Sequence, residues 1–208
     1  MPEPGILIAP NIIDWLDLLG IAVFAASGAL AAAKLRQTLV TFVFFALVTG
    51  VGGGTVRDLL IGAPVFWVQD WRFGATCLVT AGLVWVTPKA FWNERALDWF
   101  DAVGIAIYAV FGAWKSLSLG VPLLPAMMMG VITACVGGIL RDVLAGAPSI
   151  LLKPEIYVTA AALASGLFGL LLWFGASVLA AAIISAGAGF ALRAMAIWKG
   201  WAIPAYKH

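Results

Sequence analysis

Charged side chains and histidine are scarce in this 208-residue chain. Asp, Glu, Lys and Arg together make up 11% of the residues, whereas about 25% is usual in a soluble domain. The only histidine is the last residue, His208, and a terminal residue is a poor metal ligand. The sequence contains no P-loop, G-x-S-x-G, HExxH or CxxC motif. We therefore expect no enzyme activity, no resident metal and no cofactor. If the chain transports ions, these permeant ions are the only ones that we expect it to bind.

Cysteine is also rare, and the basic residues are dispersed. Cys77 and Cys135 both lie in apolar segments, where free cysteine behaves as a small buried hydrophobe. The net charge is +2 without a clustered basic face, so we expect no nucleic-acid partner. The first residues, 1–5, lack a basic n-region, so a cleaved signal peptide is not indicated.

Apolar residues dominate instead. They make up 63% of the chain, and the mean hydropathy is +1.06. A chain this short cannot bury so much apolar surface in one water-facing core, so the surrounding solvent must be lipid. The apolar runs are continuous, which favours helices over the alternating strands of a barrel. We predict an all-α integral membrane protein in contact with membrane lipid, with seven transmembrane helices. The predicted spans are residues 14–33, 39–61, 73–90, 98–117, 122–145, 156–174 and 177–198.

The strongest internal signal is a repeat with a constant offset of 84 residues. Residues 14–17, DWLD, recur as DWFD at 98–101, and GG-x-x-RD-x-L-x-GAP at 53–64 recurs at 137–148. Chance similarity between apolar segments would match Leu, Val and Ala, not Asp, Arg, Trp and Pro. Three spans per copy is an odd number, so the copies should be inverted relative to each other. The predicted units are a first three-helix repeat at 12–92, a second, inverted one at 96–175 and an unpaired seventh helix at 177–198.

The distribution of Lys and Arg predicts the orientation. Nine of these residues fall on the side of the C-terminus and three on the other side. Cytoplasmic loops carry the excess of basic residues, so we expect the N-terminus outside and the C-terminus in the cytoplasm of a prokaryotic plasma membrane. The nine are Lys34, Arg36, Lys89, Arg95, Arg141, Lys153, Arg193, Lys199 and Lys207, and the three are Arg57, Arg72 and Lys115.

Glycine runs mark matching positions in the second and fifth spans. They are Gly52, Gly53 and Gly54 in one copy, and Gly137 and Gly138 in the other. Each mid-helix glycine costs about 1 kcal/mol relative to Ala, and a run of them favours a kink or an unwound turn. One interpretation is a pair of broken helices that line an ion pathway. The other is that the glycines only permit close helix packing. The twin placement favours the first.

Ionisable residues follow the glycines. Arg57-Asp58 and Arg141-Asp142 lie close to the glycines, one pair near each membrane face of an inverted repeat. Charges within a span usually face a bundle interior or an aqueous path. The alternative is an interfacial ion pair that anchors the end of a helix.

A second acidic set lies near the start of the first and fourth spans. Asp17 and Asp101 could concentrate cations at the two mouths, or could be carboxylates placed by the helix dipole. Lys115 breaks the symmetry, since its repeat counterpart is Ala31. Its ammonium could gate a cation path or could pair with a carboxylate.

Hydroxyl groups complete the candidate pathway. Thr49 and its counterpart Thr133 stand one turn before the glycines and could contact an ion, although Thr hydroxyls more often bond to their own helix. Tyr108, where the first copy has Phe24, could add a hydroxyl at mid-membrane depth.

The doubled G-G-x-x-R-D element, in a chain with seven spans and an unpaired last helix, resembles the prokaryotic members of the trimeric intracellular cation (TRIC) channel family. The resemblance covers about residues 12–198. It implies a homotrimer that conducts monovalent cations, chiefly potassium, with a pore inside each protomer. It also implies that the second and fifth helices are kinked at Gly52–Gly54 and at Gly137–Gly138 and line that pore. The same domain type has been labelled a glycine transporter, so a secondary transporter of a small solute stays as the alternative, and a purely structural membrane protein as a third.

Overall fold

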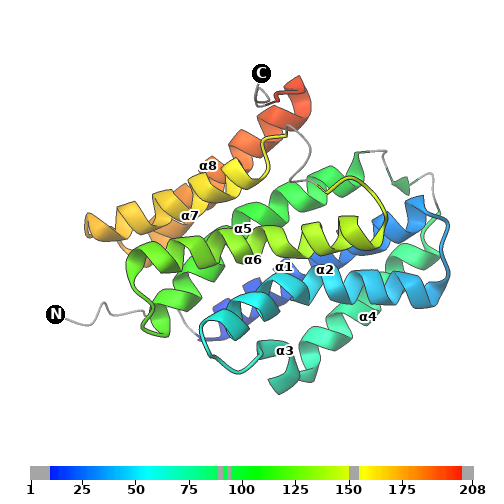
Figure 1. The fold of residues 1–208 in the computed structure, drawn as a ribbon, viewed down its shortest axis with the longest axis horizontal. Helices are drawn as coiled ribbons and strands as arrows, with labels where there is room; N and C mark the ends of the chain where they lie inside the picture. The colour runs from blue at the N-terminus through cyan, green and yellow to red at the C-terminus, as the bar shows by residue number, and fades with distance from the viewer. Residues whose placement is uncertain (1–9, 89–90, 93–94, 150–154, 203–208) are drawn as a thin grey trace.

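The computed structural model describes residues 10–88, 91–92, 95–149 and 155–202, which form eight helices (Figure 1). Residues 89–90 of the third predicted span, Lys153 and the terminal His208 lie outside this part of the chain. The helices are α1 (Pro10–Lys34), α2 (Leu39–Leu60), α3 (Phe66–Gln69), α4 (Trp71–Val86), α5 (Ala96–Ser118), α6 (Leu123–Leu144), α7 (Val158–Trp173) and α8 (Val178–Lys199).

Each predicted span coincides with a helix, and only the one-turn α3 was not predicted. Five helices are long and apolar enough to cross a membrane, whereas α4 and α7 are apolar but have only 16 residues each. The predicted end of the third span at residue 90 is wrong, because α4 ends at Val86. Thr87 is extended and precedes Pro88, and a residue before proline disfavours helical geometry.

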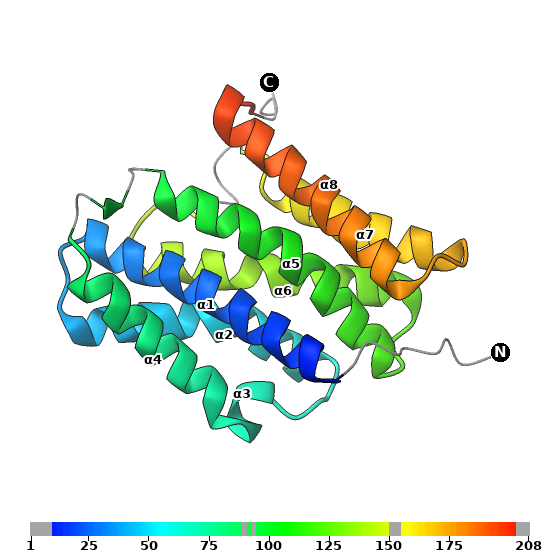
Figure 2. The same ribbon diagram turned by 180° about the vertical axis from the view of Figure 1, so that it is seen from behind.

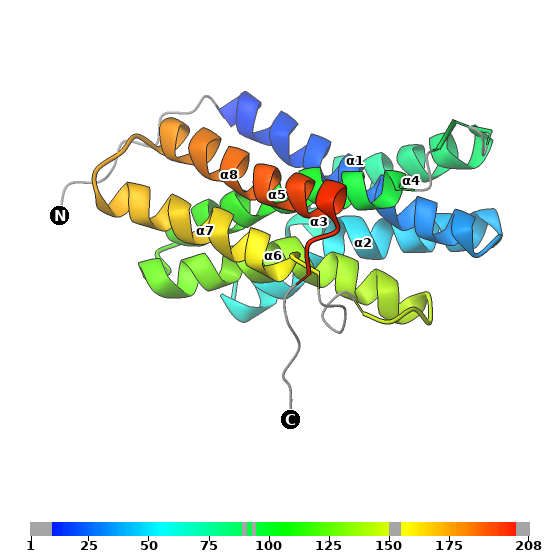
Figure 3. The same ribbon diagram turned by 90° about the horizontal axis from the view of Figure 1, so that it is seen from above.

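The helices form a bundle around α1, α2, α5 and α6. Helix α1 packs against α2, α4 and α5, and α6 packs against α2, α5 and α7. In Figure 2, α1 lies between α4 and α5. Figure 3 shows α7 and α8 side by side, where they pack against α6 and α5 respectively. Figure 1 shows α1 running in the direction opposite to α5, and α2 opposite to α6. Corresponding helices of the two copies therefore run in opposite directions.

The two copies pack reciprocally where α1 meets α5. A Cβ atom on Gly104 would lie 2.7 Å from the ring of Phe24, and one on Gly20 would overlap the ring of Tyr108. These positions exchange roles under the 84-residue offset, since Gly20 corresponds to Gly104 and Phe24 to Tyr108. The two rings meet edge to face, with their centroids 5.5 Å apart. Small residues thus let bulky rings of the other copy approach the helix backbone.

The Gly-x-Pro part of the repeated motif ends the two helices in the same way. Gly62 and Gly146 have positive φ angles of 70° and 63°, the left-handed geometry that glycine adopts readily. The next N–H groups, of Ala63 and Ala147, donate to helix carbonyls at 2.9 and 3.0 Å. This part of the motif therefore stops α2 and α6 directly after their Arg-Asp pairs.

The last helix, α8, packs through small residues. Ala181, Ser185 and Gly189 are all buried. A Cβ atom on Gly189 would lie 2.7 Å from that of Ala164 in α7. Arg193 adds an ion pair of 2.8 Å to Glu155 in the segment before α7. Helix α8 is therefore fixed to the second copy.

Candidate functional site

The glycines of α2 and α6 lie where these helices cross. Both helices continue through them, so the unwound turn considered for Gly52–Gly54 and Gly137–Gly138 is not present, whereas a kink there stays a prediction. A Cβ atom on Gly53 would overlap the carbonyl of Thr133, and one on Gly137 would overlap the carbonyl of Thr49. Tertiary packing thus compensates for the low helix propensity of glycine.

The remaining glycines of the two runs face side chains. A Cβ atom on Gly54 would lie 2.6 Å from the ring of Phe66, and one on Gly138 would lie 2.5 Å from the hydroxyl of Tyr157. Gly52 is half-buried and faces Leu140. Each run therefore lets the backbone of the other helix approach at one glycine and an aromatic side chain approach at another. Close packing accounts for the glycines in this conformation.

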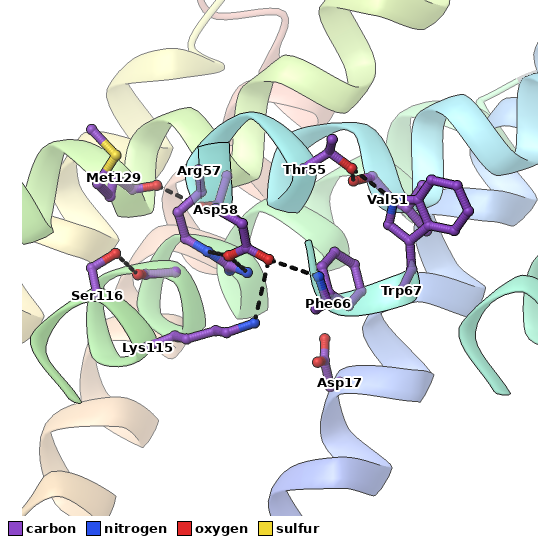
Figure 4. A network of polar contacts seen from close by, with 12 residues as sticks. Asp17, Val51, Thr55, Arg57, Asp58, Phe66, Trp67, Lys115, Ser116 and Met129 are labelled. Atoms are coloured by element: carbon purple, nitrogen blue, oxygen red, sulfur yellow. Dashed lines mark hydrogen bonds and ion pairs between the residues drawn. The ribbon is translucent and has the colours of Figure 1, made fainter. Parts of the chain in front are cut away.

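A buried charged cluster lies at the C-terminal end of α2 (Figure 4). Arg57 Nε and Nη2 donate to Asp58 Oδ1 at 2.9 and 2.7 Å. Asp58 Oδ2 accepts the backbone N–H of Phe66 at 3.0 Å and lies 3.7 Å from Lys115 Nζ. The Lys115 ammonium also stands 5.0 Å from the centre of the Phe66 ring. The predicted pairing of Lys115 with a carboxylate is thus present, across the two copies.

The matching cluster at the end of α6 is more completely paired. Arg141 Nε and Nη2 donate to Asp142 Oδ1 at 3.0 and 2.8 Å. Its Nη1 donates to both carboxylate oxygens of Asp101 at 2.7 and 2.8 Å, and to Ser27 Oγ at 2.9 Å. Because α2 and α6 run in opposite directions, the two clusters occupy opposite ends of the bundle.

Asp17 and Asp101 occupy corresponding positions but have different partners. Asp17 Oδ1 accepts the hydroxyl of Tyr108 at 2.6 Å, whereas Asp101 is bound by Arg141. The counterpart of Tyr108 is Phe24, which has no hydroxyl to offer Asp101. Arg57 Nη1 is buried and has no hydrogen-bond partner among the residues that the structure describes. The Tyr108 hydroxyl at Asp17 and the Lys115 ammonium at Asp58 therefore both distinguish the two ends of the bundle.

A cavity of about 230 Å³ opens beside the second cluster. Its polar lining comes from the end of α1, the start of α5, the end of α6 and the segment before α7. The charged residues of the lining are Lys34, Asp98, Arg141, Asp142 and Glu155, and Ala31 contributes an apolar wall.

Comparison with known proteins identifies the family. The family model described as "Glycine transporter" matches residues 14–89 and 98–174, which are the two copies of the repeat. The UPF0126 inner membrane protein YadS of Escherichia coli K12 is 42% identical over 154 residues, which are 72% of this chain and 73% of YadS. A UPF0126 membrane protein of Vibrio cholerae is 42% identical over 150 residues, which are 70% of this chain and 62% of that protein.

Solved structures extend the match to nearly the whole chain. The TRIC trimeric intracellular cation channel orthologue from Rhodobacter sphaeroides is 39% identical, with a TM-score of 0.84 over 92% of this chain and all of the other. This chain belongs to the TRIC family. A second TRIC structure, from work on conductance through TRIC cation channels, superposes with a TM-score of 0.84 at 28% identity over 97% of this chain and 98% of the other. With relatives named as membrane proteins and several long apolar helices, this TRIC protein is a multi-pass membrane protein.

The two predicted threonines of this TRIC protein differ in their contacts. Thr133 Oγ1 donates to the carbonyl of Met129 in its own helix at 2.6 Å, as threonine hydroxyls usually do. Thr49 Oγ1 is buried, finds no hydrogen-bond partner within the described part of the chain, and would lie 2.6 Å from a Cβ on Gly28. Both side chains thus lie at the helix contacts that the glycines create.

Sequence reasoning missed the aromatic residues of the two clusters. Phe66 lies beneath Lys115, and Tyr157 is fully buried with Arg193 5.4 Å from the centre of its ring. Neither residue falls in a repeated block of the sequence. The signal that could have pointed to them is the last glycine of each run, Gly54 and Gly138, where the missing side chain leaves room for an aromatic ring as well as for a helix.

Proposed function

We propose that this TRIC protein is a monovalent-cation channel, permeable to potassium, with one pore inside each protomer. The observation that carries the proposal is the pair of buried Arg-Asp clusters at opposite ends of the central bundle. Buried charges in spanning helices are expensive and usually mark an ion pathway. The related solved structures are those of TRIC cation channels, which supports the same conclusion.

The pathway in this proposal runs through the bundle of α1, α2, α5 and α6. Asp17 and Asp58 supply negative potential at one end, and Asp101 and Asp142 supply it at the other. Since Gly53 and Gly137 hold α2 and α6 in direct contact, ions pass beside this contact rather than through a break in either helix. The glycines then set the diameter of the pathway by fixing how closely the two helices approach.

In the proposed topology, α1, α2 and α4–α8 are the seven transmembrane helices, and the two three-helix halves are inverted. The N-terminus faces outward and the C-terminus faces the cytoplasm of a prokaryotic plasma membrane. Three copies assemble as a homotrimer, in line with the trimeric name of the relative from R. sphaeroides. The first cluster, with Lys115, then faces the outer side.

Replacing Lys115 by Ala is expected to raise potassium conductance. The ammonium stands 3.7 Å from Asp58 Oδ2 and repels an approaching cation. Two unit charges about 4 Å apart interact by ~1 kcal/mol even in bulk water, so we expect an increase of about fivefold or more in planar-bilayer recordings. Lys115→Arg keeps the charge and is the matched control. Equal conductance of the Ala and Arg variants would leave Lys115 with a structural role only.

Flux measurements on proteoliposomes test the proposed function. We expect radioactive rubidium to equilibrate at a rate that stays proportional to its concentration, because a channel does not saturate as a carrier does. Labelled glycine is the paired substrate. Saturable glycine uptake without rubidium flux would refute the channel.

The alternative function is a secondary transporter for a small solute such as glycine. The description of the matching family model favours it, and inverted repeats are common in carriers that rock one half against the other. Paired Arg and Asp side chains could bind a zwitterion. The rubidium and glycine fluxes decide between the two functions.

A further inference from the structure

Two aromatic side chains occupy matching places at the two ends of the bundle. The ring of Phe66 packs on Gly54, the last glycine of the run in α2. In the same way, Tyr157 packs on Gly138, the last glycine of the run in α6. Both side chains are buried, and each comes from the segment that follows the glycine-containing helix of its own copy. Each ring therefore fills the space that a missing Cβ atom leaves.

A basic side chain from outside its own copy lies over each ring. Lys115 Nζ of α5 stands 5.0 Å from the centre of the Phe66 ring, and the guanidinium carbon of Arg193 in α8 stands 5.4 Å from that of Tyr157. Both distances allow cation–π attraction. Under the 84-residue offset the counterpart of Lys115 is Ala31, which has no charge. At the second end the unpaired helix α8 supplies the cation instead.

The guanidinium of Arg193 binds a short stretch of chain at several points. Its side chain is buried, its Nη2 donates to Glu155 Oε2 at 2.8 Å, and its Nη1 donates to the carbonyl of Ile156 at 3.3 Å. With the ring of Tyr157, these contacts involve consecutive residues. The planar fork of an arginine is preorganised for such multiple bonding. Arg193 therefore fixes the backbone and the ring of this stretch together.

The hydroxyl of Tyr157 does not hold the ring in place. It is buried and has no hydrogen-bond partner among the residues that the structure describes, so the position of the ring depends on packing and on Arg193. Glu155 and Arg141 both line the cavity beside the second cluster. Because Gly138 precedes Arg141 by about one helical turn, the ring lies on the inner side of this cavity.

We propose that Arg193 is a positioning residue, which holds Tyr157 against Gly138 and so closes the second end of the bundle. Helix α8 thus acts on the pathway as well as on packing. When the guanidinium is lost, the ring leaves Gly138 and water from the cavity reaches further along α6. Only the expected effect on conductance rests on the proposed channel function.

The two cysteines of the chain test this role. Cys135 is buried about one turn before Gly138 in α6, whereas Cys77 is buried in α4 beside Gly50. Cys77→Ala leaves Cys135 as the single thiol, and Cys135→Ala leaves Cys77. The rate of labelling by a charged, water-soluble methanethiosulfonate then reports how often water reaches each position in the purified protein.

Arg193→Met is expected to accelerate the labelling of Cys135 at least about tenfold, the effect of losing ~1.4 kcal/mol from the closed state. Cys77 should keep its wild-type rate to within about twofold, because the opening is local. Arg193→Lys keeps a charge over the ring and should restore most of the protection. In planar bilayers, Arg193→Met should open more often than the wild type.

Two further variants are the matched controls. Tyr157→Phe keeps the ring and removes only the hydroxyl, so Cys135 should be labelled at the wild-type rate. Lys115→Met removes the corresponding cation at the first end and should also leave the labelling of Cys135 unchanged. Faster labelling of Cys135 in either variant would contradict the specific role of Arg193.

The outcomes separate this role from general stabilisation and from the channel. Equal acceleration of both thiols in Arg193→Met, or an unchanged rate at Cys135, overturns the inference. If Arg193→Met does not fold, Glu155→Gln removes the charged partner of the guanidinium and should accelerate Cys135 alone, and an unchanged rate there overturns it equally. Because labelling requires no current, selective exposure of Cys135 in a protein without rubidium flux would support the role of Arg193 and refute the channel.

Discussion

Alanine at Gly53 or Gly137 is expected to lower the free energy of unfolding by about 3 kcal/mol, or to prevent the central bundle from assembling. The added Cβ atom overlaps the carbonyl of Thr133 or of Thr49, and a backbone carbonyl cannot turn away as a side chain can. Overpacking of a tight core typically costs ~1–3 kcal/mol, and we expect the upper end here because neither the Cβ atom nor the carbonyl can rotate out of the contact. Unfolding of the purified protein, followed by tryptophan fluorescence, measures the effect.

Two glycines of α4 provide the matched control. A Cβ atom on Gly74 or Gly82 meets no atom of the described residues within 4 Å, so Ala there removes only the conformational freedom of glycine. We expect these variants to be as stable as the wild type, or more stable by up to ~1 kcal/mol. If Gly53→Ala unfolds like Gly74→Ala, the two helices are not in the close contact described above.

Replacing Arg141 by Met is expected to destabilise the protein by about 3–5 kcal/mol, the usual effect of removing one partner from a buried ion pair. Arg141 binds both oxygens of Asp101 as well as Asp142, and all three side chains are buried. Without the guanidinium, two carboxylates are left close together in an apolar bundle. The double variant Arg141→Met, Asp101→Asn removes one of these charges and should recover part of the loss.

The corresponding change in the first copy should be milder. Arg57 binds Asp58, but no described residue pairs with its Nη1, and Lys115 remains close to Asp58 after Arg57 is removed. We therefore expect Arg57→Met to cost clearly less stability than Arg141→Met in the same unfolding assay. Equal or reversed losses would contradict the inequality of the two clusters.

Much of the fold could be predicted from the sequence. Apolar run length locates the helices because a span needs about 20 apolar residues, and the 84-residue offset relates the two copies. Where α2 and α6 end was also predictable, because their Gly-x-Pro elements impose a left-handed turn. These features depend on local composition, which a single sequence displays.

The details of the site depend on contacts between the copies, which local patterns do not show. The low helix propensity of glycine predicted a break in the helix. The helix is continuous, however, because the backbone of Thr133 packs against Gly53. The different roles of Asp17 and Asp101 come from one hydroxyl, on Tyr108, in a helix distant in sequence from Asp17. Phe66 enters the first cluster through the short α3, which hydropathy cannot detect.

Single-channel recording of the purified protein in a planar bilayer tests the central claim, that monovalent cations pass through each protomer between its inverted halves. Under a KCl gradient, we expect unitary current steps that reverse close to the equilibrium potential of potassium. Reversal at the equilibrium potential of chloride, or the absence of any steps from protein that takes up glycine saturably, would contradict it.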